Sequence, residues 1–184
     1  SIAKVGQPYG VLYGIGFMHA PDGQLIFKDG LPVVDNTPKA LGNIQPDWMG
    51  GFSNTFTYKK LSLSVLMDAK FGGDLFDEGT GTARWTGQYA ETAIGREEGV
   101  IGKGVMNIGT ADAPNYVPND VMIAANQFYA YNNPRRYHEA AIFDGSYVKL
   151  REVSFGYKIP AGIISKIGLQ SAKVSLVGRN LAIL

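Results

Sequence analysis

The sequence predicts an all-β protein whose antiparallel strands form part of the wall of a transmembrane β-barrel. Three observations support this prediction. Five stretches alternate apolar and polar side chains with the period of a β-strand. Between these stretches, very short turns and very long loops follow one another in strict rotation. The chain also has 24 Gly, 10 Tyr and 9 Phe among its 184 residues, which is typical of β proteins with many turns and bends.

The first predicted strand covers residues 9–17, where every second residue is apolar and the intervening face is mostly glycine. Either another segment packs closely against that glycine face or the strand bends there. Residues 18–46 are predicted to be a long loop because they contain several prolines and two Asp-Gly pairs. A short hairpin around residues 25–27 is compatible with that loop.

The second and third predicted strands, residues 48–59 and 60–71, form a tight antiparallel hairpin. They are joined at Lys59-Lys60, which leaves no room for a loop. Between residues 61 and 71 only Leu66 breaks the alternation. Residues 72–146 follow as a long, polar, glycine-rich loop, and loops of such length are functional or disordered. Within it, Val121, Ala125 and Phe128 have helical spacing behind Asn119-Asp120, which predicts a short helix with a cap.

The fourth predicted strand, residues 147–159, contains a break in its alternation near Glu152. Val153, Phe155 and Tyr157 share a face, but Lys149 and Arg151 have the same parity. An Arg facing lipid at mid-membrane costs about 2–4 kcal/mol, so Arg151 must lie above the bilayer or follow a bulge. A compact turn then leads to the fifth strand, residues 172–182.

The order of long and short connections predicts long extracellular loops and short periplasmic turns. The aromatic residues agree, because Tyr58 and Tyr157 lie beside short turns whereas Trp48 and Phe71 lie beside long loops, as in two aromatic girdles. Five strands cannot close a barrel, and open strand edges in lipid leave backbone groups unsatisfied. We therefore expect the chain to be an internal fragment whose wall continues beyond both ends.

Composition argues against several other classes of protein. A net charge of +1 without a basic stripe does not suit a nucleic-acid partner. The absence of cysteine rules out disulfides and thiolate metal sites, and no run of about 18 apolar residues predicts a transmembrane helix. Gly102-Lys103 lacks the flanking residues of a phosphate loop, and no catalytic triad is legible, so an enzyme is not predicted.

The long loop supplies candidate ligand-binding residues. Sugars bind to aromatic faces together with planar hydrogen-bonding side chains, and both kinds occur here. The same side chains would also serve as the packed interior of a large ordered loop. The main candidates are Arg84, Trp85, Tyr89, Tyr116, Tyr131 and Arg135, with Trp85 beside Arg84 the strongest; Arg96, Tyr129, Arg136 and Tyr137 are of the same kind.

No cofactor or metal site is predicted. Asp74, Asp77 and Glu78 lack the spacing of an EF-hand and are more simply explained as solvated carboxylates. The two histidines, His19 and His138, lie far apart in sequence and are expected to make ordinary hydrogen bonds.

Several blocks together resemble the SusC/RagA-type TonB-dependent outer-membrane transporters, over nearly the whole chain. The matching blocks are GQPYG (6–10), YG (13–14), PDWMGGFSN (46–54), YK (58–59), GGD (72–74), YVKLREVSFGYKIP (147–160) and SLVGRNL (175–181). Each block alone is weakly specific, but the set is characteristic of that family.

The resemblance implies that residues 1–184 belong to the C-terminal part of a barrel of about 22 strands in the bacterial outer membrane. It also implies import of nutrients, mostly glycans and sometimes peptides, with a SusD-like surface lipoprotein and with TonB, both contacted by parts outside this chain. Two other interpretations stay open. The strands could form a soluble β-sandwich that binds carbohydrate, or the loops could hold an acid and a base of an enzyme.

Overall fold

The computed structural model describes residue 3 and residues 5–184; residues 1, 2 and 4 of the predicted domain lie outside the described residues. The chain divides into two compact units. Unit 1 comprises Ser1–Gln45 and Asp74–Asp144, and unit 2 comprises Pro46–Gly73 and Gly145–Leu184. The structure is mainly antiparallel β, as the sequence predicts, and its helices are short.

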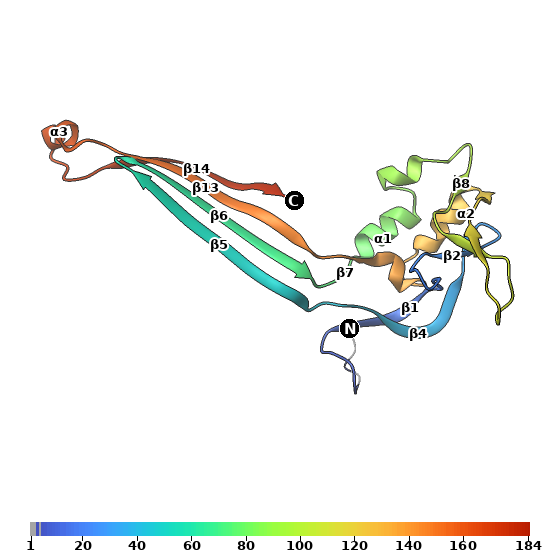
Figure 1. Cartoon of the computed structure of the whole chain (residues 1–184). Helices are drawn as coiled ribbons and strands as arrows, with labels where there is room; N and C mark the ends of the chain where they lie inside the picture. Colours follow the sequence, from blue (N-terminus) through green and yellow to red (C-terminus); the bar gives the residue numbers. More distant parts are fainter. Residues whose placement is uncertain (1–2, 4) are drawn as a thin grey trace. The chain divides into compact units, whose positions relative to one another are not determined.

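Unit 2 is a single four-stranded antiparallel sheet with the strand order β14-β13-β6-β5 (Figure 1). Its strands are β5 (Pro46–Tyr58), β6 (Leu61–Gly72), β13 (Tyr147–Lys158) and β14 (Lys173–Ile183). These bounds agree with the predicted strands 48–59, 60–71, 147–159 and 172–182 to within two residues. The alternation that predicted these four strands is therefore confirmed.

Both connections at one end of this sheet are compact. Tyr58 pairs with Leu61, so only Lys59 and Lys60 lie in the β5–β6 turn, as predicted. Lys59 has a φ of 54°, in the left-handed region that turns of this length require. The β13–β14 connection begins after Pro160 with α3 (Ala161–Ile164) and the 3₁₀ turn η4 (Ser165–Ile167), which Figure 1 shows at the far tip of the sheet.

A bulge in β13 explains the break in alternation near Glu152. Leu150 pairs with Met67 and Glu152 pairs with Leu66, so Arg151 is an extra residue with no partner on β6. The bulge returns Val148 and Leu150 to the face that carries Val153. Of the two predicted explanations for Arg151, the bulge is confirmed.

The register gives the sheet two chemically different faces. One face, called face A, is apolar over all four strands except at Asn54, which pairs with Val65. The opposite face, called face B, is mainly polar but includes Met49, Leu66 and Val177. Face A carries Trp48, Phe52, Phe56, Tyr58, Leu61, Leu63, Val65, Met67, Phe71, Val148, Leu150, Val153, Phe155, Tyr157, Val174 and Leu176. Face B carries Ser53, Thr55, Thr57, Ser62, Ser64, Asp68, Lys70, Lys149, Glu152, Ser154, Ser175 and Arg179.

Unit 1 contains a strand pair that the sequence only half predicted. β1 (Val11–Phe17) pairs antiparallel with β4 (Val34–Asn43), so the prediction of one long loop over residues 18–46 is wrong. Pro38 argued against a strand there, because proline cannot donate to a ladder. In the structure Pro38 falls in an irregularity of the ladder, between the pairs Gly16–Asp35 and Gly14–Lys39, where a donor is not needed.

The remaining strands of unit 1 are short. A mixed sheet has the order β10-β9-β2-β3, formed by β2 (Ile26–Lys28), β3 (Leu31–Pro32), β9 (Val105–Asn107) and β10 (Tyr116–Pro118). The hairpin predicted around residues 25–27 is β2–β3, and its turn residues Asp29 and Gly30 both have positive φ. Two further pairs are β7 (Leu75–Phe76) with β12 (Ile142–Phe143), and β8 (Val100–Ile101) with β11 (Met122–Ile123).

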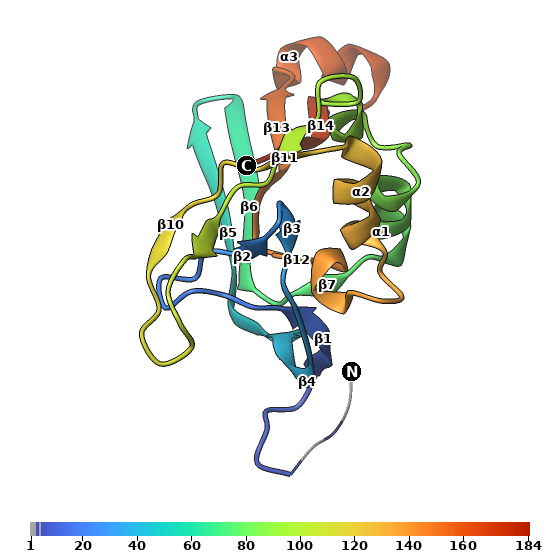
Figure 2. The ribbon, with the colours of Figure 1, turned by 90° about the vertical axis from the view of Figure 1, so that its right-hand side faces the viewer.

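Small helices complete unit 1, so the predicted loop 72–146 is an ordered segment rather than a structureless one. α1 (Glu78–Trp85) and α2 (Ala125–Tyr129) lie on one side of β2 and β3, and the β9–β10 hairpin lies on the other (Figure 2). The 3₁₀ turns are η1 (Ala90–Ala93), η2 (Ala130–Asn132) and η3 (His138–Ala141). None of the helices in the described part of the chain has the length and hydropathy needed to cross a membrane.

The predicted short helix exists as α2, but its predicted cap is wrong. The helix begins after Ala124, which offers no capping side chain. The Asn119 side chain instead donates to the Gly102 carbonyl over 2.8 Å and is buried. It stabilises the loop before β11 rather than the helix.

The glycine face of β1 is covered, as one of the two predicted explanations requires. Two side chains of η3 bond the backbone of β1: the Ile15 N–H donates to His138 Nδ1 (3.1 Å) and the Phe17 N–H donates to a Glu139 carboxylate oxygen (2.8 Å). A Cβ at position 14 would lie 2.7 Å from the His138 ring. Glycine is therefore needed here for the close approach of η3.

Candidate functional site

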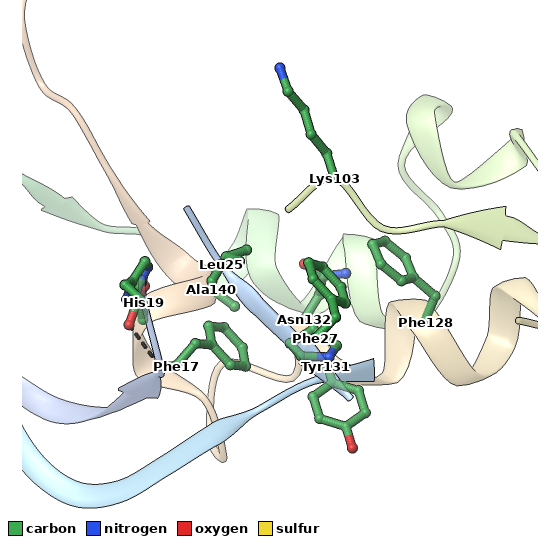
Figure 3. A pocket seen from close by; sticks show the side chains of 11 residues that line it. Phe17, His19, Leu25, Phe27, Lys103, Phe128, Tyr131, Asn132 and Ala140 are labelled. Carbon is green, nitrogen blue, oxygen red and sulfur yellow. Dashed lines mark hydrogen bonds and ion pairs between the residues drawn. The ribbon is translucent and has the colours of Figure 1, made fainter. Parts of the chain in front are cut away.

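Two of the hollows in unit 1 contain residues that the sequence predicts as candidates for ligand binding. The first, called cavity 1, has a volume of about 390 Å³. Its floor is apolar, because Phe17 and Phe27 are almost fully buried and Phe128 and Leu25 lie beside them (Figure 3). These side chains come from β1, β2, α2 and the residue just before β2, so cavity 1 depends on the packing of all these segments.

Polar groups are few in cavity 1 and are largely engaged. His19 Nε2 lies 3.0 Å from Glu139 Oε1, and the other oxygen of Glu139 accepts the Phe17 N–H. The Tyr131 ring stacks on Tyr137 with centroids 5.0 Å apart. The Lys103 side chain extends away from the aromatic rings (Figure 3). Cavity 1 therefore suits an apolar group with little hydrogen bonding.

The second hollow, called cavity 2, has a volume of about 470 Å³ and is more polar. Trp85 lines it and is 43% exposed, so part of its indole is open to solvent. Arg96 is held in place by donating to the carbonyls of Thr92 (3.0 Å) and Gly87 (2.6 Å). An open aromatic ring beside an oriented guanidinium is a suitable arrangement for a sugar.

Tyr129 closes another side of cavity 2. Its hydroxyl donates to the Glu91 carbonyl over 3.0 Å, and burial raises the pKa of this phenol above its ordinary value. Asn126, from the same helix α2, adds an amide to the lining. Because α1, η1 and α2 each contribute residues, the site is assembled from segments more than thirty residues apart in sequence, such as Thr92 and Asn126.

The structure separates the six main sequence candidates. Trp85 lines cavity 2 and Tyr131 lines cavity 1. Arg84 pairs with Glu91 at 2.5 Å and lies against the rings of Tyr89 and Phe143, so its guanidinium braces unit 1.

The other three candidates also lie outside both cavities. Tyr89 comes directly before η1, and its ring lies against the Arg84 guanidinium. Tyr116 lies in β10. Arg135 is largely exposed and pairs with Glu78 at 2.8 Å. Sequence patterns did not mark Phe17, Phe27 or Phe128 as site residues, because buried aromatic residues of a pocket wall look like any other core residues.

The carboxylates considered as a calcium site have separate structural tasks. Asp74 accepts the Asn43 N–H (2.8 Å), Asp77 caps α1 by accepting the Thr80 N–H (3.0 Å), and Glu78 pairs with Arg135. In residue 3 and residues 5–184, no three His, Asp or Glu side chains gather in a manner that could hold a metal ion.

Comparisons with known proteins point to one family. No protein-family profile matches the chain. Two curated proteins of Formosa agariphila are similar to it: "TonB-dependent receptor P3", 28% identical over 148 residues, and "TonB-dependent receptor P26", 27% identical over 153 residues. The matches cover 78% and 83% of this chain but only 12% and 14% of those proteins. The chain thus spans about an eighth of the length of these relatives.

Two solved structures share the fold. They are described as the RagAB peptide importer in the "closed-closed" state and in the "open-open" state. Their TM-scores are 0.54 and 0.53 at 16% and 15% sequence identity, and each match covers 95% of this chain and 19% of the other. The names of these three proteins describe receptors or an importer rather than enzymes. Sequence and fold together identify the chain as a relative of the SusC/RagA-type TonB-dependent receptors, matching a part of their length.

Proposed function

We propose that this chain forms part of the wall and the extracellular loops of a TonB-dependent importer in the bacterial outer membrane. The observation that carries this proposal is the pair of unlike faces of the β5–β6–β13–β14 sheet. A lipid-facing side is almost entirely apolar, and a side facing a water-filled lumen carries hydroxyls and charges. Face A and face B have these two compositions.

Strand length supports a membrane-spanning role. The four strands contain 13, 12, 12 and 11 residues, and a tilted strand needs about 9–11 residues to cross the hydrocarbon core. The aromatic residues of face A stand near both ends of the strands. Trp48 and Phe71 are paired at one end, with ring centroids 5.8 Å apart, while Tyr58 and Tyr157 flank Leu61 at the other.

The soluble β-sandwich is the main rival, and the geometry of unit 2 disfavours it. A sandwich needs a second sheet packed on the apolar face. Among the described residues of unit 2 there is one sheet, and Leu63 and Phe155 on face A are 37% and 48% exposed. β5 and β14 are also open edges, which in lipid require neighbouring wall strands.

For the nutrient, we favour an oligosaccharide. Cavity 2 supports this choice, because it combines the open ring of Trp85 with the oriented guanidinium of Arg96 and the amide of Asn126. The intact importer would work with a SusD-like lipoprotein and with TonB through parts of the protein other than this chain. A peptide is the second candidate, favoured by the similarity to the RagAB peptide importer and by the apolar walls of cavity 1.

Growth of cells that lack the parent gene tests the proposal. Deletion should abolish growth on at least one oligosaccharide as sole carbon source, together with uptake of the labelled sugar, and restoration of the gene should return both. A loss confined to peptides would favour the second candidate. Unchanged growth and uptake over a broad panel of glycans and peptides would exclude the importer.

A further inference from the structure

Face B changes character along its length. Between the middle of the strands and the Lys59-Lys60 turn, face B carries hydroxyl groups. Thr55 Oγ1 and Ser64 Oγ lie 2.9 Å apart there. Toward the other end, face B carries ionisable side chains on three adjacent strands. We call this group the charged strip; it consists of Asp68, Lys70, Lys149, Arg151, Glu152 and Arg179.

Two ion pairs fix part of the charged strip. Nε and Nη2 of Arg151 donate to the two oxygens of the Asp68 carboxylate. Arg179 Nε donates to the Glu152 carboxylate over 2.9 Å. The bulge at Arg151 adds this cation opposite Asp68 without turning any apolar residue of β13 away from face A. Each carboxylate of the strip is therefore engaged by an arginine.

The two lysines of the strip remain outside these ion pairs. Both lie against the ring of Tyr147, with Lys149 Nζ 4.0 Å and Lys70 Nζ 6.0 Å from its centroid. Among the described residues, neither lysine forms an ion pair with a carboxylate, although Lys70 Nζ donates to the Gly73 carbonyl over 3.4 Å. The strip thus keeps a surplus of two positive charges, and both belong to flexible side chains that are half-buried on the polar face.

We propose that the charged strip binds the anionic groups of an acidic oligosaccharide during its passage, with Lys149 and Lys70 as the contacting cations. This inference rests on the proposed import function. Lysine suits a transient contact, because its ammonium is a point charge on a flexible stem that can move from the Tyr147 ring to a carboxylate or a sulfate. Arg151 and Arg179 are already paired with Asp68 and Glu152, so their role is to fix the positions of these side chains within the strip.

Binding to the full-length parent in lipid nanodiscs tests the inference with matched ligands. One pair is a galacturonate oligosaccharide and its methyl ester, and the other is a sulfated galactan oligosaccharide and its desulfated form. At least one acidic form should bind about tenfold more tightly than its neutral counterpart at low salt, and this preference should shrink at high salt. Which pair responds distinguishes carboxylate from sulfate recognition.

The variant Lys70→Gln/Lys149→Gln should lose most of that preference, while Lys70→Arg/Lys149→Arg should keep it. Lys173→Gln is the matched control, because Lys173 lies on the same face at the turn end of β14 and should leave the preference unchanged. The inference is overturned if no acidic form binds better than its neutral counterpart, or if the control variant loses as much of the preference. Uptake of the neutral oligosaccharide by cells that carry the same variants reports on the import function separately.

Discussion

At the scale of single residues, two backbone N–H groups of β1 are bonded by side chains rather than by another strand. The Ile15 and Phe17 N–H groups point away from β4 and would otherwise be an open edge. His138 and Glu139, adjacent in η3, accept them, and Glu139 also holds His19. Since a buried donor without an acceptor costs about 1–3 kcal/mol, these contacts stabilise unit 1.

Replacement of Gly14 by alanine should loosen this contact. The new Cβ would lie 2.7 Å from His138 Cγ and 2.9 Å from its Cβ, which is not a flexible end, so η3 must move. Overpacking of this kind costs about 1–3 kcal/mol. Hydrogen exchange of the Ile15 amide in the full-length protein should accelerate. Gly162→Ala, where nothing lies within 4 Å of the new Cβ, should leave that amide unchanged.

Asp77 should make the start of α1 sensitive to acid. The backbone N–H of Thr80, followed by its hydroxyl, holds the pKa of this carboxyl below its usual value of 3.8. The cap's stabilisation is therefore complete above pH 3.8 and is lost as the pH falls through the lower pKa of the folded state. Exchange protection at the Thr80 amide should drop below pH 4. Asp77→Asn, which caps without titrating, should remove that pH dependence; an identical acid response in both proteins contradicts the assignment.

The candidate sites could be predicted from sequence only in part. Trp85 was identifiable because an aromatic beside arginines in a long polar loop is unusual, and it does line a cavity. Its neighbours Arg96, Tyr129 and Asn126 come from segments that only tertiary packing brings together. Arg84 and Arg96 both lie among aromatic residues in the same long loop. Arg84, however, pairs with Glu91 and packs against two aromatic rings instead of lining a cavity. Sequence spacing does not distinguish these two fates.

At the scale of elements, the strands that could be predicted from sequence are those with one apolar face, and the strands that could not are held by tertiary contacts. β5, β6, β13 and β14 alternate because each has one apolar face, and this pattern is visible in sequence. β4 does not alternate clearly; it is held by its ladder with β1, by the Lys39–Asp35 ion pair (3.2 Å) and by a bond from Lys39 to the Phe17 carbonyl. The two-residue strands of unit 1 depend on tertiary contacts in the same way, so local patterns could not reveal them.

The β5–β6 turn offers a test at this scale. Lys59 has a left-handed φ of 54°, whereas Lys60 does not have a positive φ. Lys59→Gly should therefore stabilise the hairpin by about 0.5–1 kcal/mol, because glycine adopts this conformation without strain. Lys60→Gly should destabilise it by a similar amount through the added flexibility of the unfolded chain. Urea unfolding of the full-length protein in lipid measures both; equal effects of the two changes would show that the left-handed turn is not formed.

At the scale of the whole molecule, the surroundings of face A decide between the membrane wall and every soluble alternative. Phe155 pairs with Leu63, and Ser154 pairs with Ser64 on the next rung of the same ladder. The first pair lies on face A and the second on face B. The chain contains no cysteine, so a cysteine introduced at any one of these positions is the single site in this segment to which a nitroxide label attaches.

Labels at Leu63→Cys and Phe155→Cys in the membrane-embedded parent should be accessible to oxygen and protected from a nickel chelate, since oxygen concentrates in hydrocarbon. Labels at Ser64→Cys and Ser154→Cys should show the opposite order, because face B meets water. The four sites share nearly one depth, so a difference between the pairs reports which face meets lipid rather than how deep the label lies. If the labels at 63 and 155 were shielded from both reagents, a second protein layer would cover face A, and the sheet would belong to a packed soluble domain instead.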